Sequence, residues 1–292
     1  MFRYYLFELL RFVVHLIPPR LAYGIGAFLA EATYVFSRKS RPNFRANLVW
    51  VLRYLGEETA SPEARRRIRR LIRKNFRNFS YYLIDFFRFS RFDAVRMGQL
   101  VEFSGLGNVR AALAGGKGAL GVTAHVGNWE LGGMMLALAG FPVNAIALSH
   151  QNTKLNRLFI NQRGMTGMKV IPVGRAALRS LRVLKRNELV LILGDRDVTE
   201  RGVETEFFGR KVQIPRGPAG LAARSGAAVF FGYLVRESTH RYRAVFRPPL
   251  EFDRGADREG REEQIIRGLV SEMEECIASH LDQWYMYYPV WP

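Results

Sequence analysis

The chain of 292 residues has one cysteine, Cys276. This excludes an internal disulfide and a cysteine-rich metal cluster, and it permits a reducing compartment. Cys276 lies in a predicted helix near the C-terminal end, which argues against a nucleophilic role. The sequence also lacks a GxSxG motif, a Walker-type loop and a GxGxxG loop. Serine hydrolysis and nucleotide binding therefore lose their usual signatures.

Long hydrophobic runs are missing as well, although the first 40 residues are rich in apolar side chains. Residues 1–17 predict a helix whose few polar side chains share one face: Arg3, Glu8, Arg11 and His15. Pro18-Pro19 ends it, and the next apolar segment, 21–36, is interrupted by Glu31. As a helix this second segment reaches about 24 Å, short of a ~30 Å hydrocarbon core.

We therefore expect residues 1–40 to form helices that lie in the membrane interface as an anchor. The charged residues of the first helix would be costly at the centre of a bilayer, and no signal-peptide cleavage site follows. A helical hairpin packed on the protein's own core is the alternative, and a single tilted span stays open. The remaining residues, 41–292, are predicted to form one α/β domain.

Negative charge is scarce. Asp and Glu number 26 against 44 Lys and Arg, giving a net charge of +18 and a sequence pI near 10.5. Only seven of the basic residues are lysine, so 37 are arginine. Such a field attracts phosphate-bearing partners, including nucleic acid, anionic lipid headgroups, coenzyme A and an acidic carrier protein.

The densest basic segment is a predicted helix at 62–89, which begins at Ser61-Pro62-Glu63. Apolar residues recur along one stripe, and eight cations fall in thirteen positions: Arg65, Arg66, Arg67, Arg69, Arg70, Arg73, Lys74 and Arg77. A charge run is usually a solvated face. Near an anionic leaflet, however, each cation can contribute ~1 kcal/mol. Nothing resembling a nucleic-acid reading module accompanies the run, so we expect a membrane partner and no nucleic acid.

From about residue 105 onward, strand and helix patterns alternate. Strands are predicted near 119–124, 143–148, 169–173, 189–194, 227–235 and 241–247. Helices are predicted near 129–139, 152–163, 175–186, 216–225 and 258–281. This alternation predicts a mostly parallel sheet with helices on both faces.

The first of these strands runs into the segment HVGNWE, in which His125 and Glu130 stand five positions apart. His125 lies at the carboxyl end of a strand, where open α/β sheets bind ligands. An imidazole there can take a proton from an attacking hydroxyl, with Glu130 as the acceptor that fixes its tautomer. The alternative is a capping or core histidine beside a first-turn glutamate. Asn128 is a predicted N-cap and a candidate substrate-binding residue.

Main-chain N–H groups of residues 127–129 are candidates to stabilise a developing oxyanion next to His125. Met134 and Met135 are candidates to line an apolar channel beside it, although such residues are more often plain core.

A second cluster follows the apolar strand 189–193, which delivers Asp195, Arg196 and Asp197 to the same edge of the sheet. Arg175 and Arg216 come from other strand ends. The three arginines can grip phosphates bidentately, while the two aspartates can hold the arginines in place. Each residue alone is typical of a loop salt bridge, and the clustering favours a substrate-binding role.

Taken together, HVGNWE, the apolar strand before DRD, FFG and the segment IPRGPAGLAARSGAAVFFG resemble the bacterial lipid A biosynthesis acyltransferase branch of the lysophospholipid acyltransferase superfamily. DRD followed by GVE and FFG is more similar to the phosphatidylinositol mannoside acyltransferases than to the lauroyl and myristoyl transferases, which more often have DQD. The EGTR block of the glycerol-phosphate branch is absent, which argues against simple phospholipid synthesis.

The resemblance implies transfer of a fatty acyl group from acyl-CoA or an acyl carrier protein to a hydroxyl of a glycolipid or lipid A-like acceptor. It places the enzyme at the cytoplasmic face of the inner membrane. His125 would be the general base and Glu130 its orienting carboxylate, with Glu204 as a second candidate carboxylate. Arg175 and the 195–197 stretch would bind acceptor or donor. No metal is implied, and no cofactor beyond the acyl donor.

Two rival hypotheses stay open. One is a metal-dependent phosphoesterase that uses His125, Asp195, Asp197 and His150. The other is a non-catalytic membrane-surface or nucleic-acid binder built on the basic helix.

Overall fold

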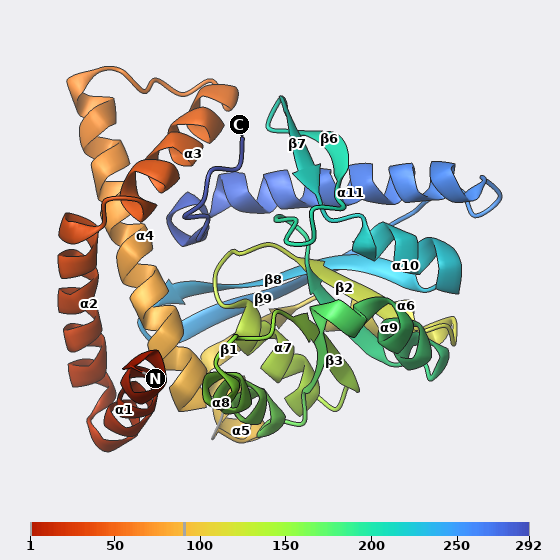
Figure 1. Cartoon of the computed structure of the whole chain (residues 1–292), viewed down its shortest axis with the longest axis horizontal. Helices are drawn as coiled ribbons and strands as arrows, with labels where there is room; N and C mark the ends of the chain where they lie inside the picture. The colour runs from red at the N-terminus through yellow and green to blue at the C-terminus, as the bar shows by residue number, and fades with distance from the viewer. Residues whose placement is uncertain (1, 90–91, 292) are drawn as a thin grey trace.

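The computed structural model describes residues 2–89 and 92–291, and its centre is a seven-stranded sheet with the order β1-β9-β8-β2-β5-β3-β4 (Figure 1). The strands are β1 (Val101–Ser104), β2 (Ala119–Thr123), β3 (Val143–Ala147), β4 (Lys169–Pro172), β5 (Leu189–Leu193), β8 (Ala228–Ser238) and β9 (Arg241–Pro249). A separate hairpin consists of β6 (Val203–Phe207) and β7 (Arg210–Ile214).

Most of the sheet is parallel. Strands β8, β2, β5, β3 and β4 run in one direction, whereas β9 is antiparallel to β8 and β1 runs parallel to β9. The expected α/β class with a mostly parallel sheet is confirmed. The short edge strand β1 and the β6–β7 hairpin were not predicted, because neither has the long apolar pattern of the central strands.

Helices cover both faces of the sheet, as expected, and Figure 1 shows α11 on the opposite side from α7 and α8. The α-helices after the basic helix are α5 (Ala94–Leu100), α6 (Leu106–Ala114), α7 (Trp129–Leu138), α8 (Thr153–Gly164), α9 (Ala176–Lys185), α10 (Gly217–Ser225) and α11 (Arg258–Ser279), with short 3-10 turns at η1 (Val173–Arg175) and η2 (Leu281–Gln283). Side chains along β2 point alternately to the two faces of the sheet and so contribute to two hydrophobic cores. Leu120 and Val122 join the side of α9, α10 and α11, while Ala119 joins the side of α5 to α8.

The N-terminal helices α1 (Phe2–Leu16), α2 (Pro19–Phe36) and α3 (Ser40–Tyr54) all contact the long helix α4 (Pro62–Phe89), and Figure 1 shows α4 between α2 and the sheet. The small buried face of α2 lies on α4, where Ser80 Oγ donates to the carbonyl of Gly26 at 2.8 Å. Met1, part of the predicted anchor, lies outside the described residues.

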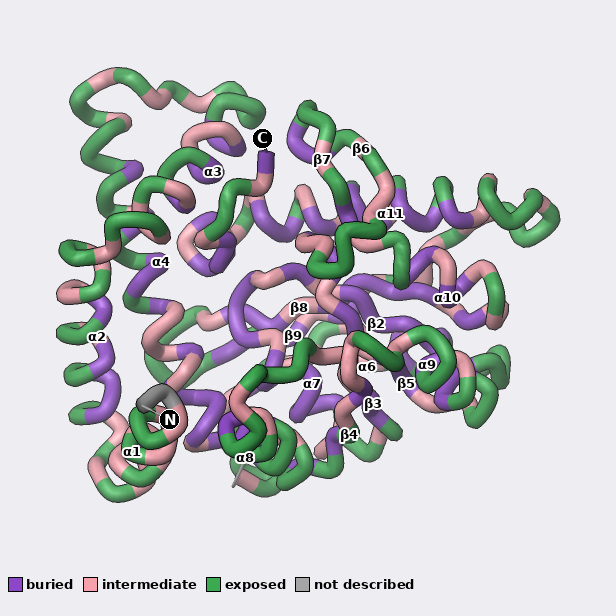
Figure 2. Tube along the Cα trace, in the orientation of Figure 1, coloured by how far each residue is buried: buried purple, intermediate pink, exposed green. Residues whose placement is uncertain are grey.

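The opposite faces of α1 and α2 stay exposed although they are apolar (Figure 2). The large exposed side chains there are Tyr5, Leu6, Leu9, Phe12, Leu16, Leu21, Ile25, Phe28, Leu29, Val35 and Phe36. Within the described ranges, no helix combines the length and the apolar character needed to cross a bilayer.

Much of the basic run on α4 is engaged in ion pairs. Glu31 of α2 pairs with Arg73 and Arg77, and the other pairs are Arg66–Glu63, Arg67–Glu57 and Lys74–Asp282. Part of this run therefore attaches α4 to the segments around it, a use that the charge pattern alone did not predict.

The aromatic C-terminal segment, 284–291, packs inside the molecule between α3, α4 and the sheet. Trp284 is fully buried. Side-chain amides of Asn43, Asn47, Asn75 and Asn78 donate to main-chain carbonyls of residues 282–288 at 2.7–3.1 Å. These amides satisfy the carbonyls of an irregular strand that would otherwise be buried without partners.

Candidate active site

The adjacent strands β2 and β5 bring two site residues together. Thr123 and Leu193 are paired at the carboxyl ends of these strands, and the main-chain N–H of Gly194 donates to the carbonyl of Thr123 at 2.8 Å. The chain then reaches His125 on one side and Asp195 on the other. Two neighbouring parallel strands thus place an imidazole and a carboxylate at the sheet edge where such folds bind ligands.

His125 and Asp195 are joined by two hydrogen bonds. The imidazole Nδ1 lies 2.7 Å from Asp195 Oδ1, and the main-chain N–H of His125 donates to Asp195 Oδ2 at 2.9 Å. The indole of Trp284 also donates to Oδ2, at 3.3 Å. The Asp195 side chain is fully buried, whereas that of His125 is 23% exposed. The imidazole is therefore the member of the pair that a substrate can reach.

The charge state of Asp195 follows from these contacts. Burial opposes ionisation, but the adjacent imidazole and the hydrogen bonds from His125 and Trp284 hold the pKa of Asp195 below its usual range. An ionised carboxylate only accepts hydrogen bonds. The hydrogen-bond pattern thus assigns the proton of a neutral His125 to Nδ1 and leaves Nε2 as the basic nitrogen.

This geometry corrects the expected pairing of His125 with Glu130. Both carboxylate oxygens of Glu130 instead accept from Arg163 of α8, with Nε at 2.8 Å from Oε2, and both side chains are nearly buried. Glu130 lies in the first turn of α7, and its side chain pairs with α8 rather than with His125. A carboxylate does pair with His125, as the motif suggested. It is Asp195, however, which follows the neighbouring strand β5.

The turn that carries His125 is held between β8 and the C-terminal segment. The carbonyl of His125 accepts from the N–H of Tyr285 at 2.8 Å, and the N–H of Gly127 donates to the carbonyl of Gln283 at 2.9 Å. Gly127 has φ +64°, and a Cβ there would lie 2.0 Å from the carbonyl oxygen of Leu234. Glycine is required because both the conformation and the space exclude a side chain.

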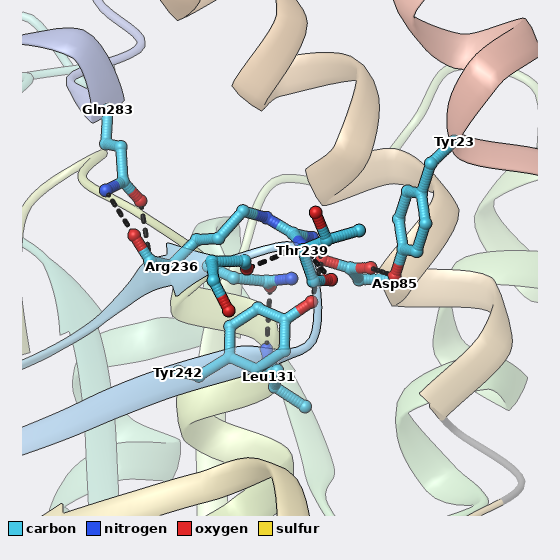
Figure 3. Close-up of polar contacts among 9 residues, drawn as sticks. Tyr23, Asp85, Leu131, Arg236, Thr239, Tyr242 and Gln283 are labelled. Atoms are coloured by element: carbon cyan, nitrogen blue, oxygen red, sulfur yellow. Dashed lines mark hydrogen bonds and ion pairs between the residues drawn. The ribbon is translucent and has the colours of Figure 1, made fainter. Parts of the chain in front are cut away.

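Gln283 is anchored in turn to Arg236 of β8. Its side-chain amide donates to the carbonyl of Arg236 and its amide oxygen accepts from the N–H of Arg236, both at 2.9 Å. Figure 3 shows how the Arg236 side chain then reaches Asp85 of α4, where Tyr23 and Tyr242 also donate to the carboxylate at 2.6 and 2.8 Å. This buried network connects α2, α4 and the sheet to the turn that carries His125.

The same contacts correct the expected main-chain oxyanion donors. The N–H of Gly127 is bonded to Gln283, and that of Asn128 donates to the carbonyl of Leu234 at 2.7 Å. Asn128 is confirmed as the N-cap of α7, since its side chain accepts from the N–H of Leu131 at 3.0 Å. Its amide is buried and does not line the cavity described next.

His125 opens into a cavity of about 1660 Å³. One part is apolar and lies between the sheet and helices α7 and α8, lined by Gly121, Gly133, Leu136, Ala145, Phe159, Met168, Leu191, Phe230, Leu234 and Phe246. The expectation that Met134 and Met135 line the channel is wrong, because neither borders the cavity and Leu136, the next residue of α7, lines it instead. The sequence offered no means to tell these positions apart.

The other part of the cavity is rimmed by arginines. Arg175, Arg196 and Arg216 line it, as the sequence predicted, together with Arg179, Arg182, Arg201, Arg224 and Arg258, which sequence analysis did not single out. Arg216 pairs with Glu262 at 2.6 Å, and Arg196 lies over the ring of Tyr288. Arg179 and Arg182 repeat along α9, a spacing that places them on one helix face.

The aspartates do not hold these arginines. Asp195 bonds to His125, while Asp197 accepts from the N–H and hydroxyl of Thr199 and from the N–H of Gly202, at 2.7–2.9 Å. Asp197 therefore shapes the loop after β5. Its pKa is lowered because these hydrogen bonds outweigh its partial burial.

The position of Glu204 does not fit its suggested role as a second carboxylate for His125. It lies on the β6–β7 hairpin, its side chain is exposed, and it pairs with Lys211 at 2.8 Å. It does not line the cavity, whereas His150 does. Across residues 2–89 and 92–291, no three side chains of the His, Cys, Asp and Glu types are grouped closely enough to hold a metal ion.

Comparison with known proteins places this geometry in a family. The model of the bacterial lipid A biosynthesis acyltransferases matches residues 1–292, the whole chain. The chain belongs to this family. It is an acyltransferase, and the family resemblance read from HVGNWE and the later blocks is confirmed.

Curated relatives of this acyltransferase include two groups. It is 28% identical to the phosphatidylinositol mannoside acyltransferase of Mycolicibacterium smegmatis, over 96% of this chain and 88% of that one, and 28% identical to that of Mycobacterium tuberculosis, over 91% and 82%. It is 27% identical to the lipid A biosynthesis palmitoleoyltransferase of Escherichia coli, over 62% and 60%. Among solved structures, the 1-acyl-sn-glycerophosphate acyltransferase PlsC from Thermotoga maritima aligns over 87% of this chain and 96% of its own, with a TM-score of 0.39 and 12% identity.

Proposed function

We propose that this acyltransferase transfers a fatty acyl chain from an acyl thioester to a hydroxyl group of a glycolipid or lipid A-like acceptor. One observation carries the proposal: a His125–Asp195 pair opens into a cavity with an apolar chamber on one side and an arginine rim on the other. An acyl chain requires the first environment and a phosphate-bearing substrate requires the second. The names of the mannoside and lipid A relatives support the acceptor class.

In this mechanism Nε2 of His125 takes the proton of the acceptor hydroxyl, and the oxygen attacks the carbonyl carbon of the thioester. The tetrahedral intermediate collapses, the carbon–sulfur bond breaks, and the imidazolium returns its proton to the leaving thiolate. The products are an ester and a free thiol. Asp195 keeps the imidazole in the productive tautomer and stabilises its charged form. No covalent acyl-enzyme is needed.

The arginine rim would hold the phosphates of acceptor or donor. Arg175, Arg179 and Arg201 line the cavity without an acidic partner in the described part of the chain, so their guanidinium groups are available to a ligand. Both acyl-CoA and an acyl carrier protein fit a cationic rim. A broad interface with an acidic carrier protein would make the rate fall steeply with salt, whereas a small donor would be less sensitive.

The exposed apolar faces of α1 and α2 support a location on a membrane surface. We propose the cytoplasmic face of the inner membrane, because the family resemblance places acyl transfer to membrane lipids there. An interfacial helix buries such a face at the headgroup boundary. The cations of α4 that lack an acidic partner in the described ranges, Arg65, Arg69 and Arg70, would face anionic lipid headgroups.

The test is mass spectrometry of membrane lipids from cells that produce the wild-type enzyme or His125→Ala. The expected result is a lipid heavier by one acyl chain with the wild type and its loss with His125→Ala, although the variant stays folded. His240→Ala is the matched control, because His240 is exposed in the β8–β9 turn. Equal acylation by the wild type and His125→Ala would contradict the proposal.

A further inference from the structure

The catalytic turn has fewer free oxyanion donors than its sequence suggests. Of the three main-chain N–H groups at residues 127–129, those of Gly127 and Asn128 already donate to carbonyls of Gln283 and Leu234. The Arg163 guanidinium on the adjoining wall is bonded to Glu130. An attack on a thioester creates a negative oxygen beside His125, and a preorganised donor aimed at it is usually a large contribution to catalysis.

Tyr82 supplies a candidate for this donor. It comes from α4, is only 8% exposed, and lines the same cavity as His125. Its ring contacts the ring system of Trp129, with centroids 4.5 Å apart, and Trp129 also contacts the His125 ring, with centroids 5.1 Å apart. Tyr82 and His125 thus share one aromatic neighbour and one cavity.

The hydroxyl of Tyr82 has no hydrogen-bond partner among the residues that the structure describes. This is unusual, because buried tyrosine hydroxyls generally find one. Two other buried tyrosines, Tyr23 and Tyr242, follow the rule and donate to Asp85. Tyr285 is buried without a hydroxyl partner among the described residues, but it does not line the cavity. A buried phenol that faces a cavity without a protein partner is available to a ligand.

The protonation state suits a donor. Burial raises the pKa of Tyr82 well above its usual value near 10, and the charge of Glu130 acts in the same direction. The hydroxyl thus stays protonated at any pH at which the enzyme works. The ring of Tyr82 also packs against Trp129 and against the ring of Phe79, with centroids 4.5 and 5.6 Å apart.

We propose that Tyr82 is a further catalytic residue, whose hydroxyl donates a hydrogen bond to the thioester carbonyl oxygen as that oxygen becomes an oxyanion. The inference rests on the proposed acyl transfer. His125 takes the proton of the acceptor hydroxyl, the new carbon–oxygen bond forms, and the carbonyl electrons move to the oxygen that Tyr82 contacts. When the thiolate leaves, those electrons re-form the carbonyl and His125 protonates the sulfur, so Tyr82 keeps its own proton throughout.

The test compares Tyr82→Phe with the wild type in steady-state acyl transfer. Loss of one oxyanion donor is expected to lower kcat by about 100-fold, with KM for both substrates within about twofold and an unchanged shape of the pH–rate profile. Tyr81→Phe is the matched control: Tyr81 is the neighbouring residue on α4, does not line the cavity, and packs against Tyr23 instead. Its kcat is expected to stay within about twofold of the wild type.

A binding measurement separates a catalytic effect of Tyr82→Phe from misfolding. The affinity for a non-reactive thioether analogue of the acyl donor, which has no carbonyl at the sulfur, is expected to be equal in Tyr82→Phe and wild type, which also shows that the variant is folded. An unchanged kcat in Tyr82→Phe, or a rise in KM alone, would overturn the role of Tyr82 while leaving the proposed function intact. A wild-type enzyme without acyl transfer would overturn both.

Discussion

Asp195 bonds to His125 twice, once through the imidazole and once through the main-chain N–H of the same residue. The carboxylate therefore fixes both the ring and the backbone from which it projects. Asp195→Asn keeps the shape but removes the charge that stabilises the imidazolium. We expect kcat to fall on the order of 10³-fold or more with a small change in KM. Steady-state kinetics checks this, and a loss below about tenfold would contradict it.

Stability in acid provides a second prediction on Asp195. Its pKa is lower in the folded than in the unfolded protein, so the ionised form contributes stability above the unfolded value near 4. This contribution is lost as the pH falls through the lower folded value. The difference in unfolding free energy between wild type and Asp195→Asn is expected to shrink as the pH falls from about 5 and to close below about pH 4. Urea unfolding across this range measures it, and a difference that widens in acid would refute the assigned direction.

Glu130 is expected to matter first for stability. Glu130→Gln leaves the buried guanidinium of Arg163 without its counter-charge, a change that typically costs about 3–5 kcal/mol. The double variant Glu130→Gln with Arg163→Met is expected to recover part of this loss. Denaturant unfolding of the single and double variants checks the coupling, and additive effects would show that the pair does not act as a unit.

The sequence predicted the parallel core well because that core depends on local patterns. Apolar runs such as 189–193 are buried strands, and the N-cap at Asn128 follows a short-range rule. The partner of His125 could not be predicted in the same way. Glu130 is near in sequence, but the pairing of β2 with β5 brings Asp195, 70 positions away, closer in space.

The other residues that the sequence analysis did not identify also depend on contacts between distant parts of the chain. Tyr82 reaches the cavity only because α4 packs against α7, and no periodicity in the sequence encodes that contact. All three of Met134, Met135 and Leu136 are buried, and which of them lines the cavity depends on the rotation of α7 about its axis. A signal for the arginine rim was present in the 37 arginines, yet composition alone could not separate those of the cavity from those paired on the surface.

The apolar chamber leads to a prediction on acyl length. Ala145 lines the cavity from β3, and Ala145→Phe would fill part of the space that the end of a long chain occupies. We expect the preferred donor to shift to a shorter chain, with activity on short donors retained. Competition among donors of several lengths, read by mass spectrometry of the product, tests this. An unchanged preference would place the chain elsewhere.

Membrane binding can be tested on the outer face of α2. Phe28 and Leu29 are exposed, and burial of one such side chain is worth about 1.5–3 kcal/mol. Replacement of both by serine is expected to weaken sedimentation with phosphatidylglycerol-containing vesicles by at least about tenfold. Val95→Ser is the matched control, since Val95 is equally exposed on α5. Equal binding by all three proteins would argue against α2 as the contact.

The pairing of residues 283–285 with the His125 turn has a consequence for biosynthesis. A ribosome makes residue 125 long before it makes residue 285. The hydrogen bond from Tyr285 to the carbonyl of His125, and that from Gly127 to the carbonyl of Gln283, cannot form until the C-terminal segment has emerged. The half-made polypeptide thus carries its imidazole on an unsupported loop, and the site around His125 is assembled only at the end of translation.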